Sequence, residues 1–195
     1  SHLEYYLQIV WPELNVNVVS TTEQWAGAAI AGPKSRDMLS KLYPDLDVSN
    51  DALPFMGYKE ADFFGVPSRI FRISFSGELA YEINVKSDHG LFMWEKMMEV
   101  GKEFGNQPYG TEALSTLRIE MGHVAGPELD GRTIPSDVSL NGLVSKKKDF
   151  IGKNSLGREA FNVESRQKIV GLIPIDRKSS IPEGSHIVQD QNAKL

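Results

Sequence analysis

The segment SRIFRISFSGELAYEINV, residues 68–85, constrains the fold of this chain more than any other stretch. Apolar side chains alternate with polar ones on both sides of a central Ser-Gly pair: Phe71, Ile73, Phe75, Tyr81, Ile83 and Val85. This alternation has the period of a β-strand, and Ser-Gly is typical of a turn. The segment therefore predicts a β-hairpin with one apolar face and one polar face, and Glu82 and Asn84 lie on the polar face.

Periodicity elsewhere in the chain predicts further helices and strands. Helices are expected at 3–10, 35–43, 89–105 with Asp88 as N-cap, 111–123 and 155–161, and strands at 15–20, 25–33 and 168–176. The strand at 25–33 ends in Gly-Pro and leads into an amphipathic helix, which makes a βα unit. This mixture favours an α+β fold, a mixed or antiparallel sheet with packed helices, over a doubly wound sheet.

The spacing of glycine and proline predicts three parts along the chain. Residues 1–123 hold the regular elements, residues 124–165 form a loop-rich connector, and residues 166–195 begin a β-rich domain. The chain starts without a methionine and stops part-way through an apparent hairpin. We therefore expect a piece of a longer protein.

Composition excludes several kinds of function. A formal net charge of -5 argues against a nucleic-acid partner, which selects for a basic face. The absence of cysteine excludes disulfides and thiolate metal sites, and the histidines lack metal-ligand spacing, so no metal site is expected. No apolar run reaches membrane-spanning length and the first residues do not resemble a signal peptide, so we expect a cytoplasmic protein without a membrane partner.

Glu82 is the candidate functional residue that pattern alone leaves open. Glutamate is depleted in strands, and here it stands between Tyr81 and Ile83. A polar position of a half-buried strand usually meets water, so periodicity favours a solvated carboxylate over one that faces a ligand. Glu78 lies four residues earlier and would share the same side of a regular strand.

Several segments taken together resemble the tetrahydrofolate-binding aminomethyltransferase family, the fold of the glycine-cleavage T-protein. They occur in this order: AIAGPKSRDMLSKL (29–42), ISFSGELAYEINV (73–85), PYGTEALSTLRIEMGH (108–123), ELDGRTIPSD (128–137) and VSKKKDFIGKNSL (144–156). The third and fifth are similar to the C-terminal part of the α subunits of heterotetrameric sarcosine oxidases. The resemblance covers essentially the whole chain and implies the aminomethyltransferase folate-binding fold with a ferredoxin-like middle domain.

The resemblance also implies a ligand and its contacts. In this family a carboxylate on a strand grips the pterin of folate, and the second glutamate of the F-S-G-E-L-A-Y-E motif maps onto Glu82. A carboxylate can accept two hydrogen bonds, from the pterin ring N–H and its exocyclic amino group. The aromatic position of the motif is Phe75, which would pack on the ligand. Arg118 is expected to anchor its helix through an ion pair, with no folate contact.

The implied function is one-carbon transfer from oxidised sarcosine to tetrahydrofolate, which gives 5,10-methylenetetrahydrofolate. FAD, FMN and NAD belong to the full complex and are not expected here, and the partners are the other sarcosine oxidase subunits. The family's acidic residue near the reacting folate nitrogen would precede residue 1, so no catalytic residue is expected in these 195 residues. We expect the isolated chain to be inactive, and formation of methylenetetrahydrofolate by it would contradict this.

Two other interpretations remain open at this point. One is a dimethylglycine oxidase or another folate-dependent aminomethyltransferase domain, and the other is a non-catalytic assembly module that has lost folate. Tetrahydrofolate binding that depends on Glu82 separates the module from the enzymes. The choice between sarcosine and dimethylglycine depends on a flavin subunit outside this sequence.

Overall fold

The computed structural model describes residues 1–182 and 184–186. They divide into two compact units, one that ends at His123 and one that begins at Val124. The further division of the second part at residue 165 stays a prediction.

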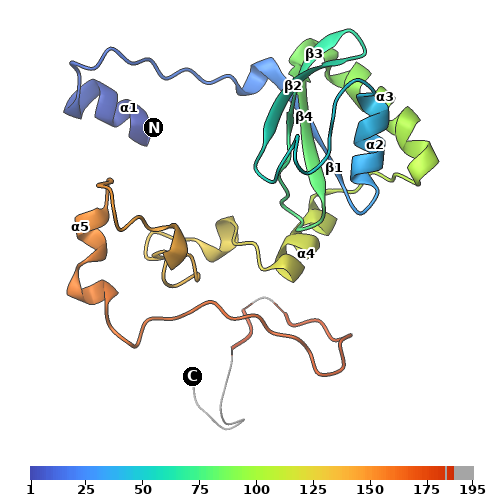
Figure 1. Ribbon diagram of the computed structural model, residues 1–195. Coiled ribbons are helices and arrows are strands. Elements are labelled where there is room, and N and C mark those ends of the chain that lie inside the picture. The colour runs from blue at the N-terminus through green and yellow to red at the C-terminus, as the bar shows by residue number, and fades with distance from the viewer. Residues whose placement is uncertain (183, 187–195) are drawn as a thin grey trace. The chain divides into compact units, whose positions relative to one another are not determined.

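The first unit is built on a four-stranded antiparallel sheet (Figure 1). Its strands are β1 (Trp25–Ala31), β2 (Tyr58–Phe63), β3 (Val66–Phe71) and β4 (Ala80–Lys86), in the order β1-β4-β3-β2. The register pairs Glu82 of β4 with Ala29 of β1 and with Phe71 of β3. β4 is therefore a central strand, and its residues 82–85 have cross-strand partners on both sides.

Helices α2 (Ser35–Leu42) and α3 (Gly90–Gly101) lie on the same side of the sheet (Figure 1). The core fills the space between them and the sheet, and its largest fully buried side chains are Leu39, Leu42, Leu53, Phe63, Ile70, Tyr81, Ile83 and Val85. Alternate residues of β4 point into this core because successive side chains of a strand face opposite ways. Glu82 and Asn84 consequently lie on the face away from α2 and α3.

The first unit also contains two further helices and several short helical turns. They are α1 (His2–Tyr5), which continues into the π-helical turn η1 (Tyr6–Val10), α4 (Thr111–Met121), and the 3₁₀ turns η2 (Thr22–Gln24), η3 (Ser87–His89) and η4 (Lys102–Phe104). The α+β class, with an antiparallel sheet and packed helices, is confirmed. From β1 to α3 the order of elements is β-α-β-β-β-α, which differs from the β-α-β-β-α-β order of a ferredoxin-like motif in the position of the second helix.

The predicted hairpin is confirmed as the pair of β3 and β4, but its bounds and one face were wrong. β3 ends at Phe71, and beyond it the contact with the β2 side continues only through two backbone bonds of Arg72, whose amide donates to the Gly57 carbonyl and whose carbonyl accepts from the Met56 amide, both over 2.9 Å. Residues 72–79 form the connection, so Phe75 and Glu78 lie outside the strands. Phe71 lies on the face of Glu82 rather than on the apolar face.

Three other predictions for the first unit were also wrong. Residues 15–20 form no strand, and their valines are exposed. β2 was missed, because its sequence YKEADF carries three charged residues. Asp88 lies within η3, and α3 has His89 at its N-cap position.

The described residues of the second unit contain one short α-helix, α5 (Lys153–Leu156), and the 3₁₀ turns η5 (Gly126–Glu128), η6 (Asn141–Leu143) and η7 (Glu159–Phe161). Residues 168–176, predicted as a strand, do not form one. No strand occurs among the described residues from 124 onward. The prediction for residues 183 and 187–195 lies outside the described residues. No helix among the residues described is long and apolar enough to cross a membrane.

Candidate functional site

The sheet face away from α2 and α3 is the first candidate site, and we call it the outer face. In the middle of this face, two cross-strand rows lie side by side. One row consists of Ala29, Glu82, Phe71 and Tyr58, and the next consists of Gly27, Asn84, Arg69 and Glu60. On the β1 side of Glu82 and Asn84 the neighbours are thus small, and on the β3 side they are large.

Glu82 is half-buried at the centre of the outer face. Its carboxylate has no hydrogen-bond or ion-pair partner among the residues that the structure describes. Ala29 beside it has no side chain beyond Cβ, which leaves the carboxylate open on that side, and the Phe71 ring borders it on the other. A half-buried carboxylate without a protein partner can accept hydrogen bonds from a bound molecule.

Arg69 crosses the outer face and limits the surface around Glu82 at one end. Its guanidinium lies over the Trp25 ring, with Cζ 4.2 Å from the ring centroid, and its Nε lies 3.4 Å from an oxygen of Glu60. The Tyr58 hydroxyl also donates to Glu60. This hydrogen bond raises the pKa of Tyr58 and lowers the pKa of Glu60. The charged side chains at this end, Arg69 and Glu60, are therefore paired with each other, whereas the Glu82 carboxylate has no partner among the described residues.

Phe75 lies in the connection between β3 and β4, with 39% of its surface exposed. Its ring packs against His123, with a distance of 4.6 Å between the ring centroids. Gly77 of the same connection has a positive φ of 86° and lies against Met121, so close that a Cβ there would meet the Met121 side chain at 2.6 Å. The connection thus rests on the end of α4, and the structure brings Phe75 together with His123.

The second candidate site is a cavity along β1, an edge strand of the sheet. This cavity has a volume of about 610 Å³ and is lined by the backbone of β1 and by apolar side chains that include Met38, Trp94, Met97 and Leu114. Neither Glu82 nor Phe75 lines it. This cavity could not be predicted from the sequence, because apolar side chains at helical spacing, such as Trp94 and Met97, are typical of an ordinary helical core.

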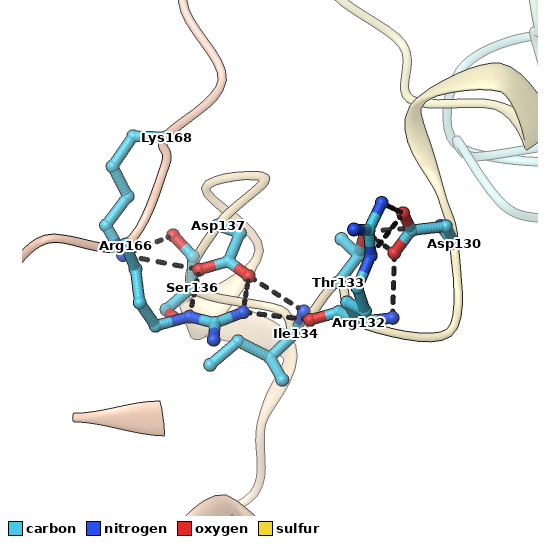
Figure 2. Close-up of polar contacts among 8 residues, drawn as sticks. All are labelled: Asp130, Arg132, Thr133, Ile134, Ser136, Asp137, Arg166 and Lys168. Atoms are coloured by element: carbon cyan, nitrogen blue, oxygen red, sulfur yellow. Dashed lines mark hydrogen bonds and ion pairs between the residues drawn. The ribbon is translucent and has the colours of Figure 1, made fainter. Parts of the chain in front are cut away.

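The second unit holds a polar cluster around Asp137 (Figure 2). Arg166 binds the Asp137 carboxylate through two nitrogens, with Nε 2.9 Å from Oδ1, and the amide of Ile134 donates to the same carboxylate over 3.0 Å. Lys168 lies 3.7 Å from Asp137, and the Ile169 amide donates to the Asp137 carbonyl over 2.7 Å. We call these contacts the Asp137 clasp, and they join segments about thirty residues apart.

The clasp borders a cavity of about 530 Å³ that is also lined by Asp130, Arg132 and Glu128. The hydrogen bond from Arg166 holds the pKa of Asp137 far below its usual range. Arg132 likewise lowers the pKa of Asp130 to about 2. Among the residues in Figure 2, the positive and negative side chains around this cavity are paired with each other. These residues therefore offer a ligand no unpaired charge of either sign.

Arg118 is buried in α4, and its Nη1 lies 3.4 Å from the carbonyl of His123. This contact spans the last turn of α4 and Gly122, which has the left-handed φ of a helix C-cap.

Within residues 1–182 and 184–186, no group of three or more histidine, aspartate or glutamate side chains could hold a metal ion.

The sequence model of the GCVT N-terminal domain family matches residues 1–148. The chain belongs to this family. It is 46% identical over 191 residues to the sarcosine oxidase subunit alpha of Rhizobium meliloti (strain 1021), and 47% identical over 190 residues to the one of Corynebacterium sp. (strain P-1). Each alignment covers 96% of this chain but only 19% and 20% of those subunits, so the chain spans about a fifth of their length.

A more distant family relative is the aminomethyltransferase of Chloroherpeton thalassium (strain ATCC 35110 / GB-78). It is 32% identical over 181 residues, which are 92% of this chain and 48% of that protein. The resemblance to sarcosine oxidase α subunits and to aminomethyltransferases is thereby confirmed. The roles of Glu82 and Phe75 are not tested by these similarities and stay predictions.

Proposed function

We propose that this chain is the folate-binding portion of a sarcosine oxidase α subunit. The observation that carries the proposal is the half-buried Glu82 carboxylate, which lies on a central strand of a GCVT-family fold with no protein partner among the described residues. Sarcosine oxidase α subunits are 46–47% identical to nearly the whole chain. In this role the chain helps to transfer the one-carbon unit of oxidised sarcosine to tetrahydrofolate.

The pterin ring of tetrahydrofolate fits the chemistry of the outer face. Glu82 accepts hydrogen bonds from the pterin ring N–H and from the exocyclic amino group, and its charge strengthens both. The flat ring has room beside Ala29, where no long side chain competes for the surface. Phe75, exposed on the β3–β4 connection, supplies apolar packing.

The whole enzyme supplies the chemistry that the chain itself does not carry. Flavins in the complex oxidise the N-methyl group of sarcosine and pass the two electrons to O2, which becomes hydrogen peroxide. The enzyme then forms glycine and 5,10-methylenetetrahydrofolate. FAD, FMN and NAD bind elsewhere in the complex, and the other sarcosine oxidase subunits are the partners of this one. The role of the present residues is to hold the folate acceptor in place.

Calorimetric titration of the full-length α subunit with tetrahydrofolate tests this proposal. Glu82→Gln keeps the size of the side chain but removes its charge, and we expect it to weaken binding by about 1.5–3 kcal/mol, the usual contribution of hydrogen bonds to a charged group. Glu78→Gln, the same substitution at an exposed position of the connection, is the matched control and should leave the affinity unchanged.

Two results would contradict the proposal. If the wild-type subunit does not bind tetrahydrofolate, the fold serves as an assembly module instead. If Glu82→Gln binds as tightly as the wild type, folate binds at another surface, of which the cavity along β1 is the first to examine.

A further inference from the structure

Asn84 is the polar neighbour of Glu82 on the outer face, two residues further along β4. It is half-buried, and its side-chain amide has no hydrogen-bond partner among the described residues. Residues i and i+2 of a strand point to the same face about 6.5–7 Å apart. Two polar groups without protein partners thus lie side by side in the middle of the sheet.

The position of the Asn84 amide depends on Gly27 of β1. A Cβ placed on Gly27 would lie 2.7 Å from Oδ1 of Asn84 and 3.5 Å from its Cγ. The amide therefore lies across the backbone of β1, in space that only a glycine leaves empty. Because Oδ1 faces Gly27, Nδ2 is turned away from it and is free to donate a hydrogen bond.

The other neighbours of Asn84 on the outer face are Arg69 and Glu82. Arg69, its cross-strand partner on β3, is engaged with Trp25 and Glu60. The Arg69 side chain reaches from β3 to β1 on the side of Asn84 away from Glu82. Asn84 is thereby held between the Arg69–Trp25 contact and Glu82.

We propose that Asn84 is a second pterin-binding residue, which reads the 4-oxo group next to the ring N–H bound by Glu82. This inference rests on the proposed function. The ring N–H and the 4-oxo oxygen are adjacent on a pterin, so a ring held by the Glu82 carboxylate presents an acceptor alongside it. The Asn84 amide donates to that acceptor, and Gly27 fixes the amide in the orientation required.

Such a pair of groups defines a class of ligand. A carboxylate beside an amide donor selects a ring edge with two donors followed by one acceptor, the pattern of a 4-oxo-2-amino pteridine. A ligand without the carbonyl would leave the amide donor unpaired, which costs affinity when the group is shielded from water. Asn84 would therefore add specificity to the binding strength that Glu82 provides.

The test compares tetrahydrofolate affinities of full-length variants by calorimetry. Asn84→Ala should weaken binding about 3- to 10-fold, the loss of one neutral hydrogen bond. Asn84→Asp should weaken it further, because a carboxylate cannot donate to the carbonyl and adds a second negative charge beside Glu82. Asn141→Ala, at an exposed position of the second unit, is the control and should bind like the wild type.

Gly27→Ala separates a role in binding from a role in packing. The new Cβ meets only the end of a flexible side chain, so the fold should tolerate it while the Asn84 amide is displaced. We expect Gly27→Ala to weaken binding as Asn84→Ala does, although it removes no polar group. In the Asn84→Ala background the same change should have no further effect. Matching thermal unfolding midpoints will establish that the variants are folded.

The inference is overturned if folded Asn84→Ala binds tetrahydrofolate as tightly as the wild type while Glu82→Gln binds weakly. It is also overturned if Gly27→Ala weakens binding equally with and without Asn84. If Glu82→Gln and Asn84→Ala both leave the affinity of the wild type unchanged, the proposed function itself has failed. The two failures are therefore distinguishable.

Discussion

Two tyrosines in the core of the first unit differ in what their hydroxyl groups contact. Tyr43 and Tyr81 are both buried, which raises the pKa of each. The hydroxyl of Tyr43 lies 2.8 Å from Oγ of Ser68, which in turn donates to the carbonyl of Ala61 over 2.7 Å. Among the residues that the structure describes, the hydroxyl of Tyr81 has no hydrogen-bond partner.

We expect the same substitution to have opposite effects at these two positions. Tyr43→Phe should lower the free energy of unfolding by about 0.5–1.5 kcal/mol, because it removes a hydrogen bond, and Tyr81→Phe should raise it by about 1 kcal/mol, because it removes a buried polar atom without a partner. Urea unfolding of both variants measures the two values. An equal loss of stability in Tyr81→Phe would contradict the absence of a hydrogen-bond partner for the Tyr81 hydroxyl among the described residues.

The strand face on which a single residue lies could be predicted only where the local alternation of apolar and polar residues determines it. The sequence placed Glu82 on a polar strand face, and the structure confirms that Tyr81 and Ile83 are buried on the other. Asn84 stood on the same predicted face but could not be singled out, because its position depends on Gly27, which lies far away in the sequence. Phe75 was assigned to a strand because periodicity does not indicate where a ladder of hydrogen bonds ends.

At the scale of elements, helices were predicted more reliably than strands. The periodicity of α2 and α3 arises within each helix, since each buries its own apolar stripe. In α4 the buried side chain is Arg118, and Ile119 and Met121 are exposed. A strand needs a partner that the local sequence does not contain. Residues 15–20 alternate like a strand and remain unpaired, whereas β2 carries three charges and pairs with β3 along its whole length.

The Asp137 clasp gives a prediction for the elements of the second unit. Because Arg166 lowers the pKa of Asp137 below its unfolded value of 3.8, the clasp contributes stability that is fully present above that pH. This contribution is lost as the pH falls from about 4 towards the folded-state pKa. Exchange protection of the Ile169 amide, which donates to the Asp137 carbonyl, should therefore decrease on acidification below pH 4.

Asp137→Asn tests the same clasp at neutral pH. Without the charge, Arg166 and Lys168 lose their common partner, and the Ile169 amide should exchange faster than in the wild type. Asp149→Asn is the control, since that carboxylate pairs on the surface with Lys153 and has no part in the clasp. Unchanged Ile169 protection in Asp137→Asn would show that the backbone hydrogen bond does not depend on the ion pair.

At the scale of the whole molecule, the sequence indicated the family that the GCVT N-terminal domain model confirms, and the folate ligand stays a proposal. Similarity covers nearly all of this chain and about a fifth of the sarcosine oxidase α subunits it matches. The α+β architecture followed from residues within the chain. The order of the strands did not, because contacts between distant segments set it. The outer face likewise required the register of three strands before Glu82, Ala29 and Phe71 could be placed in one row.

The structure of the full-length α subunit with bound tetrahydrofolate tests the central claim most directly. We expect the pterin to lie on the outer face, with its ring nitrogen and amino nitrogen at about 2.7–3.1 Å from the Glu82 carboxylate oxygens. The ring should lie beside Ala29 of β1. A pterin bound in the cavity along β1, or anywhere away from Glu82, would contradict it.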